Sequence, residues 1–201
     1  MMGLRRRVLL MAPLLLPSAV VGQSKPKIPL TLGFANLSGD DLAPLLKEDV
    51  AALSPLFARV AIADPRKVPI CQVLFVYTHL NADGSIRGST SLDIRQIAQL
   101  SKASIVVLAS PNPGDSLTTA AGIAGPKSAN LVLTTDRKGA AFPTFYRSLF
   151  ERMRDGQELL LAWVELAPQG PVTPPTPAPV SALLAEGGRM SFPKAAPPPA
   201  K

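Results

Sequence analysis

The chain has 201 residues, of which 47% are hydrophobic and 17% charged, enough apolar material for one ordinary domain with a buried core. The net charge is +7, but the basic residues are scattered and aromatic residues make up only 5%, a pattern that argues against nucleic-acid binding. The single cysteine, Cys71, excludes an internal disulfide framework and a multi-cysteine metal site, and is expected to be buried.

Residues 1–22 have the pattern of a cleaved signal peptide. The basic segment Arg5–Arg7 precedes the apolar stretch VLLMAPLLLPSAVV, which is interrupted by Pro13 and Pro17 and is shorter than the roughly 20 residues of a membrane span. We therefore expect cleavage before Gln23, a periplasmic or secreted protein, and no stable membrane span afterwards. Removing the three arginines would lower the net charge from +7 to +4.

Apolar runs alternate with segments of helical periodicity along residues 23–167, the single domain that we expect. The runs that predict strands are continuous rather than alternating, which favours a parallel sheet covered on both faces. We predict an α/β fold of three layers, with a mostly parallel sheet and helices on both faces, of the doubly wound or caspase-like type. The predicted strands are 28–36, 59–63, 72–78, 104–110 and 129–135, and the predicted helices are 42–53, 91–103, 116–124, 140–155 and 159–166.

Two local signals refine this prediction near the first helix. Ser38 and Asp41 have the spacing of a capping box and are expected to cap the helix that follows them. Pro55 is expected to end that helix.

The composition changes abruptly after Ala167. Ten of the 22 prolines fall between Pro168 and Pro199, which predicts an extended or disordered proline-rich tail over 168–201. A weak helical turn is expected around Leu183–Ala185. The tail could serve as a plain linker or as a ligand for a proline-reading domain.

Two predicted strands end in residues that could take part in catalysis. The run VLFVYT is followed by His79, the only histidine, and IVVLAS ends at Ser110. If these strands are parallel neighbours, His79 and Ser110 emerge at the same edge of the sheet, as a base and a nucleophile would.

Other polar residues also follow the predicted strands. Asn81, Asp83, Asn112 and Asp136 are candidate binding residues. The run 81–84 lacks the alternating ligands and the closing glutamate of a calcium loop, so a tight turn is expected. We expect no metal site and no cofactor.

The order of these segments resembles the caspase-like peptidases of the CHAT group over about residues 42–167. VLFVYTHLNADGS is similar to that family's histidine strand, and SIVVLASPNPG to the strand that carries its nucleophilic cysteine. The segment ANLVLTTDRKGAAFPTFYRSLFERMRDGQELLLAWVELA resembles the family's closing strand and helices. The resemblance implies that His79 occupies the position of the general base.

The departures from that family predict a loss of peptidase activity. Ser110 or Pro111 stands where the cysteine would be, and Leu80 stands where a glycine would donate to the oxyanion. We therefore expect a degenerate CHAT-like domain that binds a protein or peptide partner. Three alternatives stay open: a weak serine-type hydrolase that uses Ser110 and His79, an unrelated α/β binding module, and an envelope structural protein whose proline-rich tail reaches a partner.

Overall fold

The computed structural model describes residues 25–64, 67–88, 92–124, 130–137, 140–167, 180–184 and 190–193. The expected signal peptide, residues 1–22, lies outside this range. The strands are β1 (Ile28–Asn36), β2 (Phe57–Ile62), β3 (Val73–Tyr77), β4 (Ile105–Leu108), β5 (Asn130–Asp136) and β6 (Val180–Leu184). The α-helices are α1 (Ala43–Leu53), α2 (Ile94–Ser101), α3 (Gly114–Ala124), α4 (Ala141–Arg154) and α5 (Leu159–Leu166), and short 3₁₀ helices cover Asp40–Leu42 and Ser54–Leu56.

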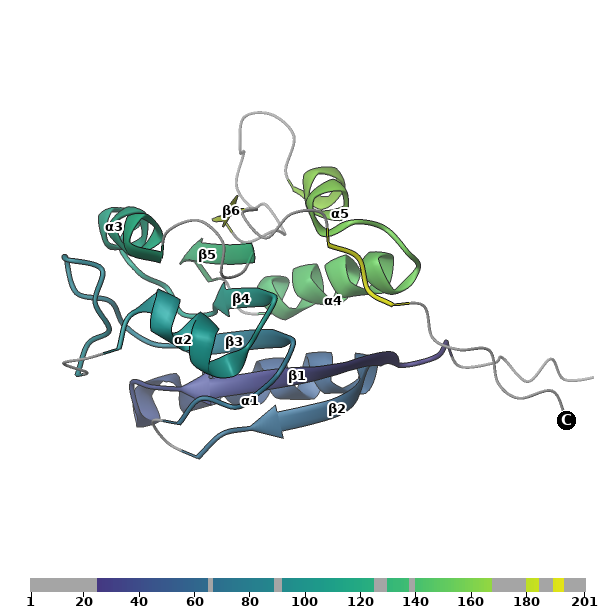
Figure 1. The fold of residues 1–201 in the computed structure, drawn as a ribbon, viewed down its shortest axis with the longest axis horizontal. Helices are drawn as coiled ribbons and strands as arrows, with labels where there is room; N and C mark the ends of the chain where they lie inside the picture. Colours follow the sequence, from purple (N-terminus) through teal and green to yellow (C-terminus); the bar gives the residue numbers. More distant parts are fainter. Residues whose placement is uncertain are drawn as a thin grey trace, which may run out of the picture.

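All six strands form one sheet in the order β2-β1-β3-β4-β5-β6 (Figure 1). The first five strands are parallel, and β6 pairs antiparallel with β5. The predicted neighbours β3, β4 and β5 lie side by side and parallel, in the register Val73–Ile105–Asn130. The predicted α/β class with a mostly parallel sheet is therefore confirmed.

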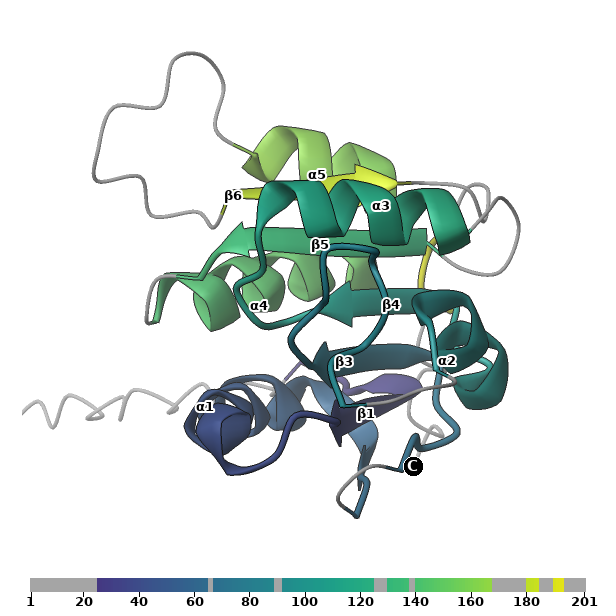
Figure 2. The same ribbon diagram turned by 90° about the vertical axis from the view of Figure 1, so that its left-hand side faces the viewer.

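The sheet is the middle of three layers, with α1 and α4 on one face and α2 and α3 on the other (Figure 2). Strand β3 shows why its sequence is apolar throughout. Phe75 and Tyr77 join the core under α1 and α4, while Leu74 and Val76 join the core under α2 and α3. Because both faces are covered, every side chain of this strand is buried.

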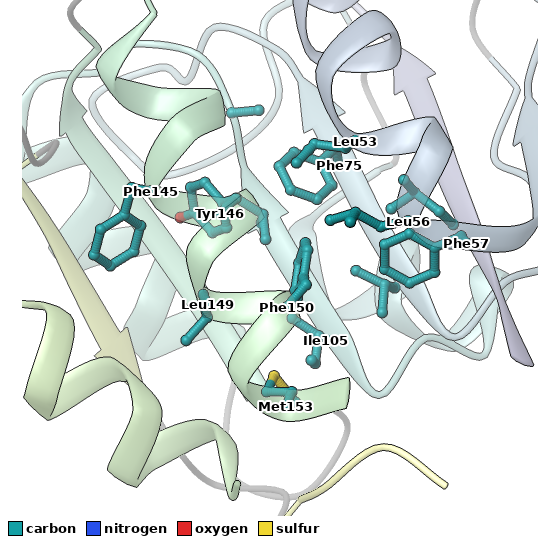
Figure 3. Packing of buried hydrophobic residues seen from close by; sticks show 14 of the residues in the cluster. Leu53, Leu56, Phe57, Phe75, Ile105, Phe145, Tyr146, Leu149, Phe150 and Met153 are labelled. Carbon is teal, nitrogen blue, oxygen red and sulfur yellow. The ribbon is translucent and has the colours of Figure 1, made fainter. Parts of the chain in front are cut away.

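The larger core is rich in aromatic residues from α4, which pack against β3 and the start of β2 (Figure 3). Phe150 is fully buried, and its ring centroid lies 5.5 Å from that of Phe57 and 6.1 Å from that of Phe75. Leu149, expected to pack on the sheet, is 1% exposed. On the other side of the sheet, Cys71 is fully buried as expected, and burial raises the pKa of its thiol to about 12.

Part of the proline-rich segment belongs to the folded unit, so the expectation of a tail from residue 168 is corrected at two places. Residues 180–184, which contain no proline, form β6 on the edge of β5, so the helical turn expected around Leu183–Ala185 is wrong where the chain is described. Phe192 is 3% exposed and packs its ring against Phe57 and Phe150. Apart from 180–184 and 190–193, the residues of this segment lie outside the described ranges.

Among the described residues, no helix combines the length and the apolar character that crossing a membrane requires.

Candidate functional site

The candidate site lies at the carboxyl edge of the sheet, where the chain leaves β1 and β3. The loops after these parallel neighbours enclose a pocket of about 260 Å³. Its walls are formed by Leu37, Ser38, Asp41, His79, Arg87 and Gly88. Ligands of doubly wound proteins bind at the carboxyl edge of the parallel sheet, which makes this pocket the candidate functional site.

Ser110, the candidate nucleophile, is fully buried and bonded to the backbone of a neighbouring strand end. Its Oγ donates to the carbonyl oxygen of Thr78 at 2.5 Å and accepts from the N–H of Thr78 at 3.0 Å. Strand β3 ends at Tyr77 and β4 at Leu108, so these hydrogen bonds lie just beyond the paired strands. The Ser110 side chain thus extends the contact between the two strand ends. Ser110 therefore holds the backbone of Thr78, the residue before His79, in place.

Asn112, a candidate binding residue, makes similar contacts. It is 5% exposed, and its Oδ1 accepts from the N–H of Leu80 at 2.8 Å. Its Nδ2 donates to the carbonyl oxygens of Thr78, at 3.0 Å, and Ser110, at 3.2 Å. The amide therefore holds the chain on both sides of His79 rather than facing the pocket.

His79 is fixed through its main chain and presents its ring to the pocket. Its N–H donates to Ser38 Oγ at 2.8 Å, and its carbonyl oxygen accepts from the N–H of Arg87 at 2.8 Å. The ring Nε2 lies 2.7 Å from Asp41 Oδ2, and the His79 side chain is 28% exposed. The hydrogen bond from His79 lowers the pKa of the Asp41 carboxyl below its ordinary value. The acid that orients the histidine is therefore Asp41.

Asp41 reaches His79 because the loop after β1 is tightly folded. Asn36 Oδ1 accepts from the N–H groups of Ser38 and Gly39, both at 3.2 Å, and Gly39 has a φ of +95°, which favours glycine. The expected capping box is wrong: the residue before α1 is Leu42, and no side chain caps the helix. Ser38 and Asp41 bond to His79 instead.

Asn81 and Asp83, two other candidate binding residues, stabilise the turn that follows His79. Asn81 Nδ2 donates to Ser85 Oγ at 2.9 Å. Asp83 Oδ1 accepts from the N–H of Ser85 at 3.0 Å and from its hydroxyl at 2.6 Å, and these bonds lower the pKa of Asp83. Gly84, with a φ of +78°, lies so close to α3 that a Cβ would come within 2.6 Å of Ala120 N. The tight turn expected at 81–84 is confirmed.

Asp136, the last candidate, ends β5, and its side chain lies outside the described part of the chain. The next residue, Arg137, has a side chain that is only 1% exposed, and sequence reasoning did not single it out. Its guanidinium donates to both carboxylate oxygens of Asp49, at 2.7 and 2.8 Å. It also donates to Ala109 O at 3.2 Å and lies 4.1 Å from the centroid of the Phe142 ring.

Tyr77 completes this buried cluster. Its hydroxyl donates to Asp49 Oδ2 at 2.5 Å, and burial raises the pKa of the tyrosine well above its ordinary value. Burial also raises the pKa of Asp49, against the lowering effect of Arg137 and Tyr77. The cluster joins α1, β3 and the chain after β4 and β5, so it holds together the elements behind the candidate site.

Comparison with protein-family models, curated proteins and solved structures found no match. Within the described ranges, no group of three or more His, Cys, Asp and Glu side chains is arranged to hold a metal ion.

The residues that sequence reasoning missed at the pocket are Asp41, Ser38 and Arg87. The signal that could have found Asp41 is its position directly after a strand that pairs in parallel with the histidine strand. The assembled pocket contains a carboxylate, an imidazole and a guanidinium, a set that can bind a polar ligand.

Proposed function

We propose that this chain is an exported binding module with a degenerate CHAT-like, caspase-like domain, and that the pocket around His79 takes a protein or peptide partner. The observation that carries the proposal is the state of Ser110. Its hydroxyl is fully buried and donates its proton to a backbone carbonyl, whereas the ring of His79 pairs with Asp41.

Hydrolysis by a serine requires a hydroxyl that a base can deprotonate and a donor for the developing oxyanion. Ser110 Oγ bonds to both main-chain groups of Thr78. The N–H of Leu80, which stands where the CHAT family has its glycine, donates to Asn112. Both groups that a hydrolase would need are thus engaged in holding the backbone, which favours binding over catalysis.

Export is part of the same proposal. The basic segment Arg5–Arg7 and the apolar stretch after it support removal of residues 1–22. The partner would then be met outside the cytoplasm, in the periplasm or beyond the cell.

Fluorophosphonate labelling and activated-ester hydrolysis test the proposal. We expect neither Ser110 nor Ser38, the hydroxyl at the pocket wall, to be labelled, because the Ser110 hydroxyl donates to Thr78 O and the Ser38 hydroxyl donates to Thr78 Oγ1. Ester turnover should be the same in the wild type, Ser110→Ala and His79→Ala. Removing a true general base would instead lower the rate by about 10² to 10⁴.

The labelled residue is identified by peptide mass spectrometry, with folding of each variant checked by circular dichroism. Label on Ser110 or Ser38 that disappears in His79→Ala would show an active hydrolase and overturn the proposal.

A further inference from the structure

Resting on the proposed function, we propose that the pocket binds the carboxylate of a peptide, with Arg87 as its charged donor and His79 beside it. Three ionisable side chains face the pocket from two loops: Asp41 from the loop after β1, and His79 and Arg87 from the loop between β3 and α2. The other lining residues, Leu37, Ser38 and Gly88, carry no ionisable group.

Arg87 is the group most available to a ligand. Its side chain is exposed, and within the described ranges its guanidinium makes no hydrogen bond or ion pair. Its position is nevertheless defined, because its N–H donates to His79 O at 2.8 Å and the bridge between Leu80 and Ile86 closes the turn. Gly88 has a φ of +79°, so the chain turns immediately after Arg87. The backbone of Arg87 is therefore held in place, and its guanidinium can donate two parallel hydrogen bonds to a carboxylate.

The charge of the pocket favours an anion. Asp41 is already bonded to His79, so the negative charge in the pocket has its own partner. Because Asp41 is engaged by His79, the Arg87 guanidinium is the charged group of the pocket that is left for a ligand. A cationic ligand would have to compete with His79 for Asp41 and approach Arg87, which disfavours it.

The size of the pocket fits one residue of a peptide. Its volume of about 260 Å³ is smaller than the roughly 300–1,000 Å³ of pockets for drug-sized ligands. Leu37, which is 8% exposed, supplies an apolar wall for the carbon atoms next to the carboxylate. A terminal or acidic residue would present its carboxylate to Arg87 while the rest of the peptide stays outside.

The test uses the tag-free chain beginning at Gln23 and two probes that differ in one group: N-acetylglycine, a carboxylate, and N-acetylglycinamide, its neutral amide. Because the chain has one histidine, the imidazole signal in ¹H–¹³C spectra reports on His79 without assignment. The variants are Arg87→Gln and, as a matched control, Arg95→Gln, an exposed arginine of α2 outside the pocket.

N-acetylglycine should shift the His79 signal in a saturable way, and N-acetylglycinamide should not. Arg87→Gln should weaken binding by about tenfold or more, as expected for a lost charge-assisted contact, and Arg95→Gln should leave it unchanged. Unchanged amide spectra of Arg87→Gln would verify its fold. Equal shifts from both probes, or wild-type binding in Arg87→Gln, would overturn the inference.

Inorganic phosphate forms a third arm of the experiment. Binding of phosphate through Arg87 without binding of N-acetylglycine would assign the pocket to phosphate and contradict a carboxylate ligand. Failure of this inference is distinguishable from failure of the proposed function. If no carboxylate binds, the chain can still be a binding module, but for a neutral partner. If a serine is labelled, the chain is an enzyme and the proposed function itself is wrong.

Discussion

Replacing Asp49 with Ala is expected to lower the free energy of unfolding by about 3–5 kcal/mol, the range for breaking a buried ion pair from one side. Asp49 is fully buried and accepts hydrogen bonds from Arg137 and Tyr77. Without it, the guanidinium would lie in the interior, 1% exposed, with no carboxylate of Asp49 to balance its charge. Urea unfolding followed by the fluorescence of Trp163, the only tryptophan, measures the change.

Glu48→Gln is the matched control for this prediction. Glu48 is the neighbour of Asp49, its side chain is 37% exposed, and it lies 3.6 Å from Arg137. A partly exposed pair of this kind contributes about 0–1 kcal/mol. Similar losses in the two variants would show that the buried cluster does not stabilise the fold as described.

Replacing Phe150 with Ala is expected to cost about 3–5 kcal/mol, because it removes a buried ring and leaves a cavity that the surroundings fill only in part. The ring is fully buried, and its centroid lies within about 6 Å of those of Phe57, Phe75 and Phe192. These partners come from three separate parts of the chain, as the close-up of this core shows for Phe57 and Phe75 (Figure 3).

Leu160→Ala provides the control for Phe150→Ala. Leu160 lies on α5 and is 53% exposed, so truncating it should change stability by no more than about 0.5 kcal/mol. A loss below about 1 kcal/mol in Phe150→Ala would contradict the tightly packed core.

The strands could be predicted because burial on both faces leaves a continuous apolar run in the sequence. The run 72–78 supplies side chains to both cores, so its composition alone favoured a central parallel strand. The same reasoning correctly brought the ends of this strand and of 104–110 to one edge, where Ser110 contacts Thr78. The sequence-based bounds of these strands were longer than the hydrogen-bonded ladders by one to two residues at their carboxyl ends.

The contacts of polar side chains could not be predicted in the same way. A serine after a strand can act as a nucleophile or can hold a neighbouring backbone segment through hydrogen bonds. The hydrogen bonds of Ser110 to Thr78 distinguish these two roles. Arg137 pairs with Asp49, 88 residues earlier, a contact that no local pattern encodes. Strand β6 was missed because the surrounding prolines dominated the composition of a segment whose five paired residues contain none.

The central claim is that His79 pairs with Asp41 and not with Ser110, and the pH titration of its imidazole signal tests this most directly. In the wild type, the signal should show an inflection on the acid side of an ordinary aspartate titration, as Asp41 takes up a proton at its lowered pKa and the hydrogen bond is lost. We predict that Asp41→Asn removes this inflection and that Ser110→Ala preserves it. Loss of the inflection in Ser110→Ala with its retention in Asp41→Asn would contradict the account.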